Sequence, residues 1–114
     1  MSQSSVALAS DAQDVALHGT AVSLRVARLD RGDATTRHRH AHEGIIYVVG
    51  GRGHTIIDGR RRELVAGSMI YIPPGVWHQH HAADDQAMTY LTATNLPLLE
   101  AVGLGAAFEE GDTQ

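Results

Sequence analysis

The sequence predicts an all-β domain, a small sandwich or barrel, and three observations predict it. Apolar and polar residues alternate with a period of two, as in residues 22–26. Turn signals such as Asp58-Gly59 recur at short intervals between such runs. No segment has the strand–helix–strand order of a parallel βαβ unit. A chain of 114 residues is the size of one domain with one core, so we take residues 1–114 as that domain.

Short strands account for most of the chain, about seven or eight in number. The runs expected to form them are 22–26, 38–42, 45–49, 54–57, 63–65, 69–72, 76–81 and 88–94. Gly51 and Gly75 are expected where the chain turns between strands. The pair Pro73-Pro74 ends the strand that precedes the second histidine window.

Only the end of the chain has a helical pattern. Asn95 is placed to cap a short helix that stops near Gly103. The structured core is therefore expected to span about 21–94 and the helix that follows it. Residues 1–12 and 110–114 are expected to be flexible.

The composition excludes several classes of function. The formal net charge of −4 gives no basic surface for nucleic acid. The absence of cysteine excludes disulfides and thiol nucleophiles, and the absence of lysine excludes Schiff-base chemistry. No apolar run is long enough to span a bilayer, and the first residues do not resemble a signal peptide. We therefore expect a cytoplasmic protein with no nucleic-acid or membrane partner.

Histidine is concentrated in two short windows. Of the eight histidines, six lie at positions 38, 40 and 42 and at positions 78, 80 and 81. Alternate positions put side chains on one face of a strand. If both strands face the inside of a barrel, the imidazoles converge on a site for a divalent transition metal. His18 and His54 stand apart and are expected on the polar surface.

The spacing of glycine, proline and histidine resembles the cupin family over residues 21–94. The first cupin motif, G-x5-H-x-H-x3/4-E-x6-G, is matched by Gly32, His38, His40 and Gly51, with Gly44 at the glutamate position. The second motif, G-x5-P-x-G-x2-H-x3-N, is matched by Gly67, Pro73, Gly75 and His78, with Ala82 at the asparagine position. The resemblance implies a small double-stranded β-helix, or jelly-roll, barrel. It says less about function, because this barrel hosts enzymes, binding proteins and storage proteins.

The resemblance also implies a ligand set. The usual cupin site holds its metal with three histidines and the motif glutamate, for which Gly44 supplies no side chain. His38, His40 and His78 then remain as a three-histidine site with open coordination positions. Glu43 is adjacent, but its parity points it to the other face of a strand unless a bulge intervenes.

The other histidines of the two windows have several candidate roles. His42 shares the parity of the ligands and could be a fourth ligand, a substrate hydrogen-bond donor or a general base. His80 shares the parity of His78 and could contact the metal ligands without binding the metal itself. Gln79 and His81 alternate away from it and are expected to face outward.

The three-histidine site implied for this chain resembles the sites of gentisate-type ring-cleaving dioxygenases and of small diketone-cleaving dioxygenases. The first type also has a small residue at the glutamate position and a PP-x-x-W-H-x-H stretch like residues 73–80. The resemblance implies Fe(II), with Zn²⁺, Ni²⁺ or Mn²⁺ as alternatives, and an anionic small-molecule substrate that binds beside dioxygen. Gentisate enzymes are two-cupin chains, so this domain would be a reduced relative.

The substrate pocket has candidate residues on several strands. Those expected to line it are Arg25, Tyr47, Met69, His80, Met88 and Tyr90. A substrate carboxylate would pair with one of the arginines at positions 25, 28, 37 and 39.

Three functions remain open, and the first is preferred. It is an iron dioxygenase, an oxidoreductase that acts on a small organic substrate. The second is a non-redox cupin cyclase, isomerase or lyase, in which a metal acts as Lewis acid or His42 as base. The third is a non-catalytic cupin that binds a small molecule. A homodimer is expected from the resemblance alone.

Overall fold

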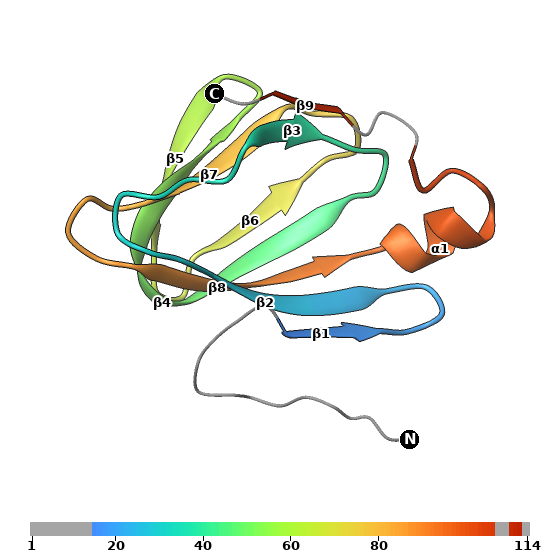
Figure 1. Ribbon diagram of the computed structural model, residues 1–114, viewed down its shortest axis with the longest axis horizontal. Helices are drawn as coiled ribbons and strands as arrows, with labels where there is room; N and C mark the ends of the chain where they lie inside the picture. The colour runs from blue at the N-terminus through green and yellow to red at the C-terminus, as the bar shows by residue number, and fades with distance from the viewer. Residues whose placement is uncertain (1–14, 107–109, 113–114) are drawn as a thin grey trace.

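The computed structural model describes residues 15–106 and 110–112, which form nine antiparallel strands and one short helix (Figure 1). The strands are β1 (Val15–His18), β2 (Ser23–Leu29), β3 (Arg37–Arg39), β4 (Gly44–Ile57), β5 (Arg60–Val65), β6 (Met69–Ile72), β7 (His78–Ala82), β8 (Met88–Thr94) and β9 (Glu110–Asp112), and the helix is α1 (Leu96–Ala101). The predicted all-β jelly-roll barrel with a short C-terminal helix is confirmed. No helix in the described part of the chain is long and apolar enough to cross a membrane.

The strands form two layers that share β4. One layer has the order β1-β2-β8-β4-β6, and the other has the order β5-β4-β7-β3-β9. In Figure 1 the second layer lies above the first, and β4 runs between them. The sheet therefore curls over on itself, and the two layers enclose the interior of a barrel.

The interior beside β4 is filled by apolar side chains. Along β4 the burial alternates, with Ile46 and Val48 inside and Ile45 and Tyr47 outside. The buried core consists of Ala27, Ile46, Val48, Leu64, Ile72, Ala82, Met88 and Tyr90. Ile46, Ile72 and Tyr90 of this core also line the cavity of the candidate site, so the core forms one of its walls.

A single long strand replaces two predicted ones. The sequence predicted separate strands at 45–49 and 54–57 with a turn at Gly51, and this prediction is wrong because β4 runs unbroken from Gly44 to Ile57. Its pairing with β8 shifts register between Val48 and Gly50, and Gly51 has φ +82°. The glycines therefore bend the strand at a bulge, and β4 passes from one layer into the other.

The second half of β4 lies very close to the connection between β7 and β8. A Cβ at Gly51 would lie 1.8 Å from the carbonyl oxygen of Ala87, and a Cβ at Gly53 would lie 2.0 Å from that of His81. The Gly53 position would also crowd the sulfur of Met88, at 2.9 Å. Glycine at these positions is therefore required by close backbone packing.

The ends of the chain differ from the expectation in two ways. Glu110–Asp112 were expected to be flexible but form β9, which pairs with β3; residues 1–12 lie outside the described residues. Asn95 does stand at the start of α1, but its side chain makes no capping hydrogen bond. Instead, its Oδ1 accepts a hydrogen bond from the backbone N–H of Glu43 at 3.0 Å, which ties the helix to the segment before β4.

We expect Gly53→Ala to lower the free energy of unfolding by about 2 kcal/mol, because the added methyl group would overlap the His81 carbonyl. Gly50→Ala is the matched control, since no atom lies within 4 Å of a Cβ there. Its effect should stay within about 0.5 kcal/mol. Urea denaturation of both variants measures the difference, and equal effects would contradict the close-packing argument.

Candidate metal centre

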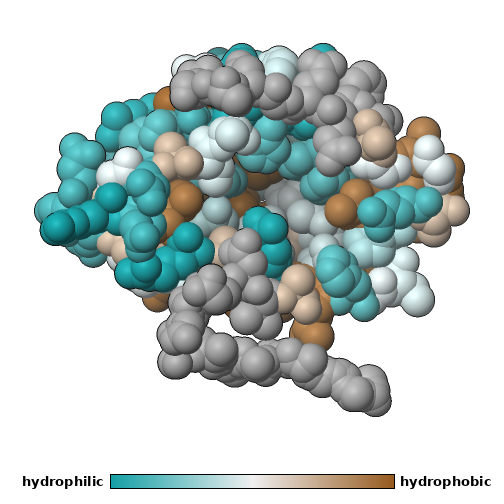
Figure 2. All heavy atoms as spheres, in the orientation of Figure 1, coloured by the Kyte–Doolittle hydropathy of each residue, from teal (hydrophilic) through white to brown (hydrophobic). Residues whose placement is uncertain are grey.

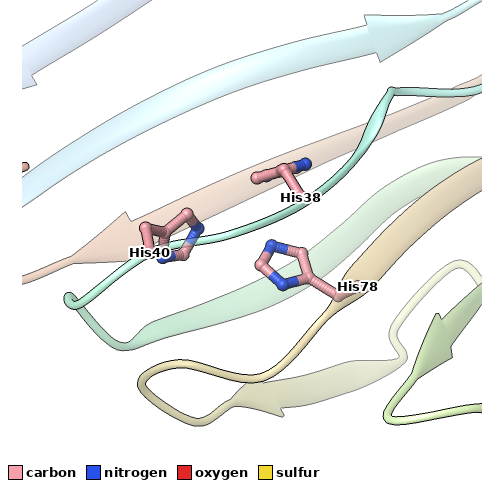
Figure 3. Close-up of side chains that lie close together, drawn as sticks. All are labelled: His38, His40 and His78. Carbon is pink, nitrogen blue, oxygen red and sulfur yellow. The ribbon is translucent and has the colours of Figure 1, made fainter. Parts of the chain in front are cut away.

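The two histidine windows meet inside the barrel. His38 in β3 lies directly opposite His78 in β7, and His40 follows the end of β3. Figure 3 shows the three side chains pointing into one space between β3 and β7. One possible ligand atom from each residue lies within 4.8 Å of the others. The predicted three-histidine cluster is present.

Strand alternation and a turn place these side chains. In β7 His78 and His80 are buried, whereas Gln79 and His81 lie on the opposite face, as predicted. His40 lies beyond the strand, and its carbonyl oxygen accepts a hydrogen bond from the N–H of Gly75 at 2.7 Å. Gly75 has φ +74°, so the turn after Pro73-Pro74 both directs the chain into β7 and holds His40 in place.

Each of the three imidazoles hydrogen-bonds through Nδ1 to a backbone carbonyl two residues away. The acceptors of His38, His40 and His78 are the carbonyls of Thr36, His42 and Val76, at 2.8, 3.0 and 2.9 Å. A carbonyl oxygen can only accept, so Nδ1 carries the proton in all three rings. In the neutral ring, Nε2 then has a free lone pair.

This arrangement fits a transition-metal ion. Histidine ligands of metals commonly donate their second ring nitrogen to a carbonyl or carboxylate, which fixes the ring and its tautomer. Imidazole nitrogens bind such ions at about 2.0–2.1 Å. One ring nitrogen from each of the three residues lies within 4.8 Å of the others, so the rings are close enough together to share one ion. His38, His40 and His78 are therefore the residues that would hold it.

Burial keeps the interior histidines uncharged. Desolvation, together with the neighbouring His38 and His40, lowers the pKa of His78 to about 4, although its hydrogen bond to Val76 acts in the opposite direction. Desolvation also lowers the pKa of His80 to about 3. In the metal-free protein the buried His78 is thus uncharged at pH 7, with its lone pair available for coordination.

A cavity of about 350 Å³ adjoins the three histidines. Figure 2 shows this face of the molecule hollowed near its centre. The lining of the cavity includes three of the predicted pocket residues, Arg25, His80 and Tyr90. The rest of the lining includes the polar residues Ser23, Thr35, Thr92 and Thr94 and the apolar residues Ile46, Ile72 and Leu96. A larger hollow of about 1000 Å³ beside β5 and β6 contains no histidine, so we place the candidate site in the smaller cavity.

Three predicted pocket residues lie elsewhere. Tyr47 and Met69 are paired across β4 and β6 on the outer face, where they are 39% and 70% exposed. Met88 is fully buried in the apolar core and does not line the cavity. The assignments of Tyr47 and Met69 were wrong because both faces of β4 and of β6 are apolar, so alternation alone did not show which face points inward. Met88 does point inward, but it packs in the core away from the cavity.

His42 lies in the cavity wall but outside the ligand cluster. The strand expected over 38–42 ends at Arg39, so parity does not place His42. Its ring stacks on that of His40, with centroids 3.6 Å apart and planes 8° apart. Its Nδ1 is buried and has no hydrogen-bond partner among the described residues. Burial, followed by His40 and His38, lowers its pKa to about 4.

The other charged candidates are directed away from the cavity, except for one arginine. Glu43 accepts a hydrogen bond from the Tyr71 hydroxyl at 2.6 Å, on the outer surface. Arg28 pairs with Asp30. The guanidinium carbons of the arginines at 37 and 39 lie 4.2 and 5.0 Å from the Trp77 ring centroid. Arg25 is thus the only one of the four candidate arginines in the cavity lining.

His18 is exposed, as expected, but sequence reasoning missed that it also lines the cavity. It ends β1, a strand that was not predicted, and pairs with Ser23 across a hairpin. The hairpin is closed by a hydrogen bond from the N–H of Gly19 to the carbonyl of Val22 at 2.7 Å. The Gly19-Thr20 pair directly follows the short strand that begins at Val15, and its glycine was the sequence signal for this turn.

Gly44 occupies the position of the family's glutamate and lines the cavity. A Cβ at Gly44 would lie 3.4 Å from both the carbonyl oxygen of Ala93 and Cγ2 of Thr94, which is van der Waals distance. Its φ is not in the left-handed region. Neither space nor backbone conformation requires glycine here, in contrast to Gly53.

The sequence profile of the cupin domain matches residues 25–94, which include all three clustered histidines. The chain belongs to the cupin family. A solved cupin protein from Bacteroides fragilis superposes with a TM-score of 0.74 at 29% identity, and the match covers 82% of each chain. The fold and the placement of the two motifs are therefore those of a cupin.

Two curated relatives have different activities. Gentisate 1,2-dioxygenase of Ralstonia sp. is 30% identical over 80 residues, which are 69% of this chain and 22% of that protein. The 1-methylthio-D-xylulose 5-phosphate methylsulfurylase of Rhodospirillum rubrum is 29% identical over 107 residues, which are 82% of this chain and 69% of that protein. This cupin thus spans about a fifth of the length of the dioxygenase and most of the length of the methylsulfurylase.

We expect the metal-free protein to lose stability as the pH falls from about 6.5 to about 4. In this window the histidines of the unfolded chain bind protons, whereas His78 and His80 in the folded protein do not, so acid favours unfolding. His80→Gln removes one of these titrating groups and should make the decline above pH 5 shallower. Unfolding free energies measured across the range test this, and identical slopes would contradict it.

Proposed function

We propose that this cupin is a metal-dependent enzyme that oxidises a small organic substrate with dioxygen at Fe(II) held by His38, His40 and His78. The observation that carries the proposal is three converging imidazoles beside Gly44, which adds no carboxylate. Neutral ligands leave the positive charge of the ion for an anionic substrate and leave coordination positions open. Bound Fe(II) would supply the one-electron chemistry that reaction with dioxygen requires.

The cavity favours a substrate of about one ring. Its volume of about 350 Å³ is at the lower end of the range for small-molecule sites, about 300–1000 Å³. Arg25 contributes a positive charge to the lining and could pair with a carboxylate. The similarity to gentisate 1,2-dioxygenase, whose name describes a hydroxylated aromatic acid as substrate, supports the same class here.

The chain's own residues would orient this substrate and exclude water. The hydroxyl of Thr92 offers a hydrogen bond, while Ile46 and Ile72 keep one wall apolar. His42 is neutral at pH 7, because its pKa is about 4. A pKa this low makes His42 a weak base. We therefore assign it as a hydrogen-bond partner of a substrate hydroxyl and not as the general base.

A non-redox reaction is the second candidate, and one observation favours it. The chain matches 69% of the length of the methylsulfurylase, a far larger share than the 22% of the dioxygenase. In such a reaction the metal at the same three histidines would act as a Lewis acid, and Zn²⁺, Ni²⁺ or Mn²⁺ would serve as well as iron. The homodimer and the cytoplasmic location stay predictions.

Oxygen uptake by Fe(II)-reconstituted protein tests the proposal. With gentisate present, we expect oxygen consumption that requires both substrate and metal. His78→Ala should lose most of the metal and the activity, while Gln79→Ala, whose side chain points out of the barrel, should keep both. Turnover of 1-methylthio-D-xylulose 5-phosphate under nitrogen would favour the second candidate. A full metal content in His78→Ala would overturn the assignment of the centre.

Gly44→Glu tests whether the open coordination sphere matters. The new carboxylate would fill one position beside the three histidines, so metal should bind at least as well while chelating substrates bind worse and oxygen-dependent turnover falls. Gly44→Ala is the matched control and should stay active, because its Cβ fits at van der Waals distance. Undiminished activity of Gly44→Glu would show that the missing carboxylate has no functional role.

A further inference from the structure

A second pair of histidines lies on the outer face of the layer that contains β5, β4 and β7. His54 in β4 is directly opposite His81 in β7 on one side and Glu63 in β5 on the other. The next residues along the strands, Thr55 and His80, are buried inside the barrel. Because side chains alternate across a strand, the row Glu63–His54–His81 lies on the outer surface.

The two imidazoles of this row are in contact. Their ring centroids are 4.3 Å apart and their planes are 9° apart. Nε2 of His81 is buried and has no hydrogen-bond partner among the described residues. A buried polar atom without a partner destabilises the folded chain, so a group that satisfies this nitrogen would stabilise it.

The surroundings favour a cation that binds neutral imidazole. Burial, followed by His81 and Arg61, lowers the pKa of His54, and burial with Arg61 lowers that of His81. Both rings therefore have a free lone pair at pH 7. Glu63 and Asp84 lie close enough to His54 to oppose this pKa shift, which places negative charge beside the pair.

A hollow of about 460 Å³ adjoins this row on the surface. It is lined by three carboxylates, those of Glu63, Asp84 and Asp85, and by two arginines, Arg52 and Arg61. Each arginine is paired with one of the carboxylates: Arg52 with Asp85 and Arg61 with Glu63, both at 2.5 Å. The acidic groups thus outnumber the basic ones, and the hollow can accept a positive ion.

We propose that His54 and His81 bind one divalent transition-metal ion on the outer surface. Ions that suit imidazole, such as Zn²⁺, Ni²⁺ and Cu²⁺, are the expected ligands, with water in the remaining positions. The site is separate from the interior centre, since His81 points to the opposite face of β7 from His78 and His54 lies beside it on β4. An ion here would join β4 to β7 and stabilise the folded chain by mass action.

The test is a titration with Zn²⁺ alone, followed by calorimetry. In the variant His38→Ala/His40→Ala, which lacks the interior site, we expect one remaining ion per chain. Adding His81→Ala should weaken this binding by about tenfold or more, and Glu63→Gln should weaken it less. Gln79→Ala, on the same outer face, is the matched control and should leave it unchanged.

Two results would overturn the outer site: no ion bound by His38→Ala/His40→Ala, or binding that survives both His54→Ala and His81→Ala. Wild-type protein provides a readout that does not depend on how the variants fold. In long-range nitrogen-15 spectra, the ring nitrogens of His54 and His81 should shift only after the first equivalent of Zn²⁺ is taken up. Their failure to respond to further Zn²⁺ would also overturn the proposal.

Discussion

The close approach of the β7–β8 connection to the backbone of β4 is the constraint on which the rest of the structure depends. With no Cβ at Gly51 or Gly53, β4 can bend and contribute to both layers of the barrel. Its second half then pairs with β7, where Ile57 lies opposite His78. That register turns His78 inward, toward β3 and His38. The metal centre thus depends on two glycines that touch none of its ligands.

The backbone also determines the chemistry of the three ligands. Each Nδ1–H is held by a carbonyl two residues away, so each ring presents Nε2 without help from a carboxylate. Because the partners are neutral, no negative charge is added near the metal. Together with Gly44, this makes a centre whose ligands are all uncharged. An anionic substrate would then be the main source of negative charge at the ion.

Local spacing predicted the parts of the site that lie on regular strands. His78 and His80 alternate with outward residues in β7, so parity alone identified their face. Parity does not account for His42, which lines the cavity although β3 ends at Arg39 and irregular backbone follows. Parity failed for Tyr47 and Met69, because apolar residues on both faces of β4 and of β6 leave the direction of the interior undetermined.

The fold class followed from turn signals and period-two patterns, but the topology did not. Gly50-Gly51 has the composition of a turn, yet contacts with Ala87 and Met88, distant in sequence, make it a bend within one strand. His18 lies in the cavity lining because a hairpin pairs β1 with β2, and β1 lies outside the two cupin motifs. Such features depend on contacts between residues that are distant in sequence, and local sequence patterns do not reveal those contacts.

The tautomer of the three clustered histidines is the most direct measure of the central claim, that the backbone prepares three Nε2 lone pairs for a metal. It can be read in the metal-free protein from long-range proton–nitrogen-15 correlations of the imidazole rings. The structure predicts that His38, His40 and His78 carry their proton on Nδ1 at pH 7. A proton on Nε2 in any of the three would contradict the account, since that nitrogen would then have no lone pair to offer.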